Sequence, residues 1–263
     1  MVLNRRQFSA VGTGAAAATL AGVTTARATT ARTTTRDGEP AVRNVVLVHG
    51  AYADGSSWAK VIPLLQAAGL NVIAVQNPLT SLADDVAATN FALTRVDGPT
   101  VLVAHSYGGT VISQAGLDPK VTGLVYVAAR APEAGEDYAA LAAKFPTPPV
   151  NAGIITSGGF KFIDQPAFLR DFANGVPRKE ALTLYAAQGP LSTAAPTTSV
   201  AAWHQRPSWY AVSKNDRTID PDLERFMARR MGATTIEVDA GHLSLVSHPE
   251  VISRLILRAA ARS

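Results

Sequence analysis

Short apolar runs alternate with amphipathic segments along most of this 263-residue chain, and this alternation limits the folds that it can adopt. The apolar runs are rich in valine and alanine, and we predict strands at residues 44–48, 71–75, 100–104, 123–127, 208–212 and 234–238. The segments between them have helical spacing at residues 57–68, 82–94, 108–116, 221–231 and 249–260. Strands that alternate with helices favour parallel pairing, with helices on both faces. The sequence therefore predicts an α/β fold with a doubly wound, mainly parallel six-stranded sheet.

One connection is too long to be a simple crossover between neighbouring strands. Residues 131–203 contain several prolines and glycines, and helical patterns occur near residues 137–144, 166–173 and 179–188. A segment of this length with elements of its own is typical of an insertion. We predict that it forms a helical cap over the carboxyl-terminal edge of the sheet, where α/β folds bind their ligands.

The amino-terminal residues have the composition of a targeting segment. Arg5 and Arg6 precede an uncharged stretch at residues 9–26, which ends in the cleavage-site pattern Ala26-Arg27-Ala28. A retained membrane anchor is the alternative, although the apolar run is shorter than the ~20 residues of a bilayer span. The predicted segments are a twin-arginine-type signal at 1–28, a flexible linker at 29–40 and a folded domain at 41–263. We therefore expect the twin-arginine export machinery as a partner and a secreted or periplasmic location.

Charge and cysteine content argue against several classes of function. The formal net charge is +4, and loss of Arg5, Arg6 and Arg27 with the signal would leave +1, without the basic stripe of a nucleic-acid-binding protein. The chain has no cysteine, which excludes disulfides, thiolate nucleophiles and cysteine-based metal sites. Its five histidines lack the spacing of metal ligands. We expect no metal and no other cofactor.

A serine lies where the third predicted strand turns into a helix. The sequence Ala104-His105-Ser106-Tyr107-Gly108 differs from the nucleophile elbow G-x-S-x-G only at its first position. In such an elbow a strained turn lifts the serine hydroxyl above the strand ends. The alternative is that Ser106 only caps the following helix.

A serine hydroxyl needs a base and a third group that orients the base. His242 follows the last predicted strand and Asp216 follows the fifth, so both would share a sheet edge with Ser106. The chain order serine, aspartate, histidine is that of the nucleophile elbow. His242 as a loop histidine and Asp216 as a turn residue are the alternatives. The other nearby acids have simpler interpretations, as a helix cap, a first-turn acid and a strand-end residue, for Asp220, Asp222 and Asp239 respectively.

The turn after the first predicted strand can supply donors for negative charge on a substrate oxygen. This turn has the sequence His49-Gly50-Ala51-Tyr52. We predict that the backbone N–H groups of Ala51 and Tyr107 form an oxyanion hole. His49 is expected to hold the loop by side-chain hydrogen bonds.

Four motifs together resemble the α/β-hydrolase superfamily over roughly residues 42–260. They are HGAYADGSSW at 49–58, AHSYGG at 104–109, SKNDRTI at 213–219 and DAGHLSLVSHPE at 239–250. Within the superfamily, the chain resembles the small-capped branch that contains plant methylesterases and hydroxynitrile lyases. The resemblance implies that Ser106 is the nucleophile, His242 the general base and Asp216 the acid. It also implies that Ala51 and Tyr107 supply the two oxyanion amides.

Two departures from the lyase members of this branch favour hydrolysis. The lyases typically carry lysine directly after the catalytic histidine, where this chain has Leu243, and threonine where it has Gly50. We therefore expect an exported serine hydrolase, a carboxylesterase for small to medium apolar esters that forms an acyl-enzyme on Ser106. A cofactor-free lyase or perhydrolase, or a non-catalytic binding protein with a hydrolase fold, are the alternatives.

The predicted cap contains several aromatic residues that could line a substrate pocket. We assign Tyr52 and Trp203 to this pocket, while the other cap aromatics could equally form the cap core. Few charged residues are expected nearby, which is the basis for an apolar substrate. No sequence pattern sets an oligomeric state.

Overall fold

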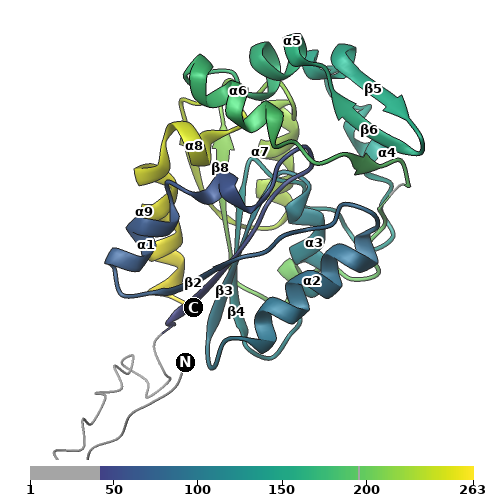
Figure 1. Ribbon diagram of the computed structural model, residues 1–263. Helices are drawn as coiled ribbons and strands as arrows, with labels where there is room; N and C mark the ends of the chain where they lie inside the picture. Colours follow the sequence, from purple (N-terminus) through teal and green to yellow (C-terminus); the bar gives the residue numbers. More distant parts are fainter. Residues whose placement is uncertain (1–41, 195) are drawn as a thin grey trace, which may run out of the picture. The chain divides into compact units, whose positions relative to one another are not determined.

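A six-stranded parallel sheet forms the centre of the protein in a computed structural model, which describes residues 42–194 and 196–263 (Figure 1). The strand order is β2-β1-β3-β4-β8-β9, and every pair of neighbours is parallel. The predicted α/β fold is therefore confirmed. The predicted signal and linker lie outside the described residues. The strands are β1 Asn44–Val48, β2 Asn71–Ala74, β3 Thr100–His105, β4 Val121–Val127, β8 Ser208–Ser213 and β9 Thr234–Val238.

Helices cover both faces of the sheet, so its central strands are buried along their whole length. All residues of β1 and β3 are buried, as parallel strands with two covered faces require. Helix α1 contacts α9, and α2 contacts α3 on the other side of the sheet in the view of Figure 1. The helices outside the connection between β4 and β8 are α1 Ile62–Ala67, α2 Leu82–Thr94, α3 Gly108–Ala115, α7 Pro221–Arg230, the short α8 Ser244–Ser247 and α9 Pro249–Ala260. In the described part of the chain, no helix is both long enough and apolar enough to cross a bilayer.

The helical pattern at residues 57–68 is divided into two elements. A 3₁₀ turn, η1, covers Gly55–Trp58, and α1 begins only at Ile62. Pro63 lies in the first turn of α1, where its missing N–H costs no hydrogen bond. In the interior of one long helix the same proline would remove an i to i−4 bond. The proline therefore sets where the regular helix begins.

The connection between β4 and β8 contains helices at the three predicted patterns and also strands that we did not predict. Besides its helices it forms a second sheet of three antiparallel strands in the order β5-β6-β7. Gly158 and Gly159 join β5 to β6 with φ of 56° and 80°, which is the left-handed backbone of a two-residue hairpin turn. The sequence signal for this hairpin was therefore present. The elements are α4 Tyr138–Ala142, η2 Pro149–Gly153, β5 Ile154–Ser157, β6 Phe160–Ile163, α5 Gln165–Ala167, the π-helical turn η3 Phe168–Phe172, α6 Arg178–Ala186, β7 Leu191–Ser192 and η4 Ala202–His204.

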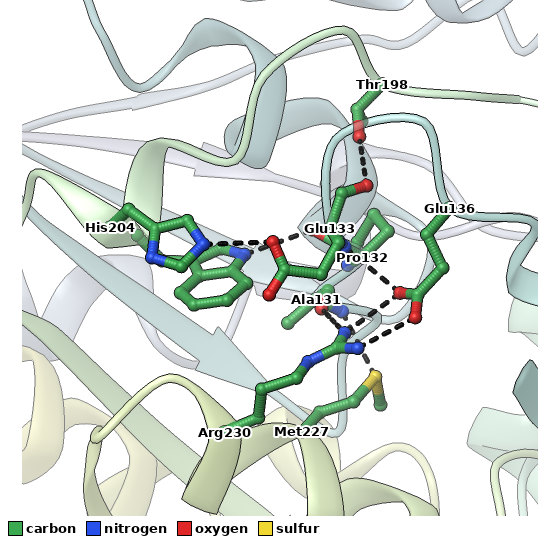
Figure 2. A network of polar contacts seen from close by, with 9 residues as sticks. Ala131, Pro132, Glu133, Glu136, Thr198, His204, Met227 and Arg230 are labelled. Atoms are coloured by element: carbon green, nitrogen blue, oxygen red, sulfur yellow. Dashed lines mark hydrogen bonds and ion pairs between the residues drawn. The ribbon is translucent and has the colours of Figure 1, made fainter.

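A polar network holds the first and last segments of this cap near α7 (Figure 2). Arg230 at the end of α7 makes a bidentate ion pair with Glu136, with N–O distances of 2.7 and 2.9 Å. Glu133 accepts a hydrogen bond from His204 through its carboxylate and one from Thr198 through its backbone carbonyl. These contacts join residues from both ends of the insertion. They therefore fix the two ends of the insertion relative to each other and to α7.

Candidate active site

Ser106 occupies a strained turn between β3 and α3. Its φ is 53°, a left-handed backbone conformation that residues other than glycine rarely adopt. Its carbonyl accepts hydrogen bonds from the N–H groups of Gly109 and Arg130, each at 3.0 Å. A Cβ atom on Gly109 would lie 2.0 Å from the carbonyl oxygen of Arg130, so only glycine fits there. The turn is thus the close-packed elbow that the sequence predicted.

Three distant side chains meet in one line of hydrogen bonds at the carboxyl-terminal edge of the sheet. The Oγ of Ser106 lies 2.9 Å from Nε2 of His242, and Nδ1 of His242 lies 2.6 Å from Oδ2 of Asp216. A carboxylate only accepts, so Nδ1–H of His242 donates to Asp216 and Nε2 is left to accept from the serine hydroxyl. All three residues are buried. This arrangement suits transfer of a proton from serine to histidine.

Asp216 is itself fixed by the turn that carries it. Its Oδ1 accepts from the backbone N–H groups of Thr218 and Ile219 at 2.6 and 2.9 Å. The rejected candidates have other partners, as expected. Asp220 accepts from the N–H of Asp222 at the start of α7, and Asp239 accepts from the side chain of Asn215. The structure brings Asp216, and neither of these, to His242.

A second histidine lies behind the first. The ring of His105 is 4.6 Å from the ring of His242, centroid to centroid, and its Nε2 lies 3.1 Å from the carbonyl oxygen of His242. Burial, and then the nearness of His242, hold the pKa of His105 well below its usual range. A neutral His105 donates Nε2–H to that carbonyl. Sequence analysis gave His105 no role, because the residue before a nucleophile serine carries no motif signal of its own.

The loop after β1 approaches the elbow closely. A Cβ atom on Gly50 would lie 2.7 Å from the Cβ of Ser106, so a threonine at this position would require a shift. His49 holds the loop, as expected, because its Nδ1 donates to the carbonyl of Gly50 and its Nε2 accepts from the N–H of Asn77. Burial lowers the pKa of His49, which favours this neutral form.

Ala51 and Tyr107, the predicted oxyanion residues, flank Ser106 from two loops. Ala51 lines the same cavity as Ser106, and Tyr107 directly follows the serine at the start of α3. Among the hydrogen bonds of residues 42–194 and 196–263, neither backbone N–H donates to a protein acceptor. Both amides therefore lack an acceptor within the described residues, as an oxyanion hole requires.

A buried carboxylate that sequence analysis missed orients the side chain of Tyr107. The Tyr107 hydroxyl donates to Oδ2 of Asp85 at 2.7 Å, and the N–H of Leu79 donates to Oδ1 at 2.8 Å. Burial raises the pKa of Asp85, and burial together with the charge of Asp85 raises that of Tyr107. Asp85 lies in the first turn of α2, where an acid is common without any further role. Only its burial distinguishes it.

The π-helical turn of the cap contacts the loops that carry the acid and the base. Asp171 pairs with Arg217, the neighbour of Asp216, at 2.7 Å, and Asn174 donates to the carbonyl of Asn215 at 2.9 Å. The ring of Phe172 lies 5.2 Å from the ring of His242, centroid to centroid. The cap therefore encloses the histidine and braces the aspartate loop.

A cavity of about 530 Å³ opens beside Ser106 and is lined by core and cap residues. Tyr52 lies in its wall, as predicted, but Trp203 does not. The indole N–H of Trp203 donates to the carbonyl of Pro132 at 3.1 Å, and its ring lies 3.9 Å from that of His204, centroid to centroid, at an angle of 30°. The assignment of Trp203 to the pocket is therefore wrong, because the chain returning from the cap uses this side chain as packing. The apolar part of the lining includes Ala142, Pro146, Pro148, Ile154, Leu191 and Leu223.

The expectation of few charges near the pocket is also wrong. Four charged side chains line the cavity, which are those of Arg130, Lys161, Asp137 and Asp220. They come from separate segments of the sequence, so no local pattern predicts that these charges share one cavity. In the ranges that the structure describes, no three histidine, aspartate or glutamate side chains gather as a metal site would require.

Comparison with known proteins adds family relationships to this geometry. Residues 45–255 match the model of the alpha/beta hydrolase family. The chain is 33% identical over 131 residues to a carbendazim hydrolyzing esterase from a Nocardioides species, which covers 44% of this chain and 53% of that protein. It is 25% identical over 244 residues to the alpha/beta hydrolase nvfD of Aspergillus novofumigatus, which covers 83% of this chain and 97% of that protein. The first alignment thus spans about half the length of the relative.

The fold is similar to that of polyneuridine aldehyde esterase. The two structures superpose with a TM-score of 0.71 over 82% of this chain and 98% of that one, at 17% sequence identity. At this level of identity the likeness concerns the fold.

Proposed function

Because the chain belongs to the α/β-hydrolase family, we propose that it is a serine esterase that cleaves carboxylic esters through an acyl-enzyme on Ser106. One observation carries this proposal, the unbroken hydrogen-bond line from Asp216 through His242 to Ser106 at the wall of a cavity. The relative named as an esterase supports the same reaction class.

The first half of the reaction forms the acyl-enzyme. His242 takes the proton of Ser106 at Nε2 while Oγ attacks the ester carbonyl carbon, and the amides of Ala51 and Tyr107 receive the oxyanion. Asp216 stays ionised and stabilises the imidazolium across the 2.6 Å contact. Collapse of the tetrahedral intermediate passes the proton from Nε2 to the leaving alcohol.

The second half repeats these roles with water. His242 takes a proton from water, the hydroxide attacks the acyl carbon, and the proton returns to Oγ of Ser106 as the acid leaves. Each half develops negative charge at the same place, so one pair of fixed amides serves both. Loss of one such donor typically costs ~10²- to 10³-fold in kcat.

The cavity favours esters of small to medium size with an apolar body. A volume of about 530 Å³ lies within the range of small-molecule sites, and much of its wall is aliphatic. Hydrolysis is favoured over cyanohydrin cleavage, because Leu243 is buried where the lyases have lysine and because the Cβ of a threonine at Gly50 would crowd Ser106.

A fluorophosphonate probe and matched substrates test the proposal. We expect the probe to add to Ser106, seen by mass spectrometry of the modified peptide, and p-nitrophenyl butyrate to be hydrolysed while cyanohydrins are not cleaved. Peracid formation from acetate and hydrogen peroxide would indicate the perhydrolase alternative. An unlabelled Ser106 in folded protein, with no turnover of any ester, would favour the non-catalytic binding protein.

We also propose that residues 1–28 direct export through the twin-arginine pathway and that the mature enzyme is periplasmic or secreted. The Arg5-Arg6 pair, the uncharged stretch and the small-residue cleavage pattern support this. In a bacterial host, replacement of both arginines by lysine should retain the protein in the cytoplasm. An unchanged distribution between fractions would contradict the proposal.

A further inference from the structure

Arg130 connects the elbow to the cavity. Its backbone N–H donates to the carbonyl of Ser106 at 3.0 Å, and its own carbonyl packs against Gly109. Arg130 also lines the same cavity as Ser106. The position of this cation is therefore set by the same turn that sets the position of the serine.

Aromatic rings hold the guanidinium without neutralising it. The Cζ of Arg130 lies 4.4 Å from the ring centroid of Tyr138 and 5.8 Å from that of Tyr107. Removal from solvent raises the pKa of Tyr138 to about 12 and also raises that of Tyr52, so these phenols stay neutral beside the cation. Cation–π contacts orient an arginine without supplying a counter-ion, so the guanidinium keeps N–H groups that can donate to an anion.

The charges of the cavity wall do not cancel in pairs. Asp137 accepts from the N–H groups of Ala139 and Ala140, and Asp220 accepts from that of Asp222, so helix N-termini offset both carboxylates. Among the residues that the structure describes, neither Arg130 nor Lys161 forms an ion pair. The Nε of Arg130 is buried and has no hydrogen-bond partner in this part of the chain. The two cations of the cavity wall therefore have no counter-ion among the described residues.

We propose that Arg130 selects esters that carry a carboxylate, bound by the guanidinium while the ester carbonyl lies at Ser106. The proposal rests on the esterase function and adds a charge at one end of an otherwise apolar substrate. The planar guanidinium suits a carboxylate because two parallel N–H groups can donate to its two oxygens. A partly desolvated arginine without a counter-ion gains more from such a ligand than from a neutral one.

Two pairs of esters test this preference and differ only in charge. Monomethyl adipate and methyl adipamate place a carboxylate or its neutral amide on the acyl side. The meta-acetoxybenzoate and meta-acetoxybenzamide pair places it on the alcohol side. We expect the carboxylate member of at least one pair to have a kcat/KM about tenfold higher, in the range that a charge-assisted hydrogen bond supplies.

Variants assign the preference to one side chain. Arg130→Gln should bring the ratio within each pair close to one, and Arg130→Lys should keep part of it. Arg95→Gln removes the same charge from an exposed position outside the cavity and should leave the ratio unchanged. Equal kcat/KM within both pairs for the wild type, or a preference that survives Arg130→Gln, would overturn the proposal. A preference lost only in Lys161→Gln would move it to the other cation.

A binding measurement separates this proposal from the esterase function. In a Ser106→Ala background, calorimetry should show monomethyl adipate or meta-acetoxybenzoate binding about tenfold more tightly than its amide, and no difference once Arg130 is glutamine. Absence of turnover on every ester, including neutral p-nitrophenyl acetate, would overturn the esterase function and leave this comparison intact. Equal binding of acid and amide by the Ser106→Ala variant that retains Arg130 would overturn the charge preference and leave the esterase function in place.

Discussion

The imidazole of His105 donates a hydrogen bond to the backbone carbonyl of His242, so one histidine positions the other. The two rings are 4.6 Å apart, and the low pKa of His105 keeps it neutral beside a histidine that must accept a proton. A positive charge at position 105 would oppose protonation of His242. A neutral donor instead fixes the loop without adding charge.

Replacing His105 tests this positioning role. His105→Phe removes the donor and leaves a buried carbonyl unpaired, which typically costs about 1–3 kcal/mol. We expect a lower melting temperature and a reduced kcat with little change in KM, while His105→Gln, which keeps an N–H donor, should recover much of both. Equal losses in the two variants would mean that the ring packing, and not the hydrogen bond, is what matters.

The backbone strain at Ser106 gives a prediction about stability. Ser106→Ala and Ser106→Gly should both abolish ester hydrolysis, because each removes the nucleophile. Glycine relieves the left-handed φ of 53°, whereas alanine retains a strain of about 1 kcal/mol or more. Thermal unfolding should therefore show a higher melting temperature for Ser106→Gly than for Ser106→Ala. The reverse order would mean that the elbow stores little strain.

The choice between the two carboxylates near the site can be tested directly. Asp216→Asn keeps the size of the side chain but removes the charge that orients His242 and stabilises its protonated form, so kcat should fall by ~10³-fold or more. Asp239→Asn is the matched control, because the carboxylate of Asp239 accepts its hydrogen bond from the exposed side chain of Asn215 and not from His242. Activity within about threefold of wild type is expected for this control. A larger loss of activity in Asp239→Asn than in Asp216→Asn would show that Asp216 is not the acid of the site.

Buried Glu224 predicts a dependence of stability on pH. Burial, and then the nearness of Asp216, raise the pKa of Glu224 well above its usual value of 4.5. Its Oε2 accepts a hydrogen bond from the backbone N–H of Ser213 at 3.1 Å. The folded state therefore retains a proton that the unfolded state loses above about pH 4.5, so the free energy of unfolding falls as pH rises through the folded pKa.

Glu224→Gln imitates the protonated carboxyl and removes this proton from the equilibrium. Between pH 5 and pH 9, a span chosen around the usual glutamate value, its melting temperature should fall less than that of the wild type. Glu250→Gln, at an exposed position in the first turn of α9, should retain the wild-type dependence. Parallel pH curves for Glu224→Gln and wild type would show that Glu224 is already ionised in the folded protein.

The sequence alone determined the six strands of the central sheet, most of the helices around it and the identity of the elbow. Strands β1 and β9 occupy the predicted ranges to the residue, because the β-branched and apolar residues that favour a strand are contiguous in the sequence. The strained turn at Ser106 could be predicted for the same reason. The small residues that flank a serine between a strand and a helix are neighbours in the sequence. The hairpin at Gly158-Gly159 carried a local signal too, although the prediction did not use it.

Only the tertiary structure decided which side chains share a space. Asp85, Glu224 and Arg130 are ordinary charged residues in the sequence, and their burial or their place in the cavity wall depends on where distant segments return. Trp203 was placed in the pocket by residue type, yet on the returning chain its indole N–H donates to the carbonyl of Pro132 instead. Hydrogen bonds and desolvation act over a few ångströms, so these distances between segments, and with them the charge of the cavity, exist only once the chain is folded.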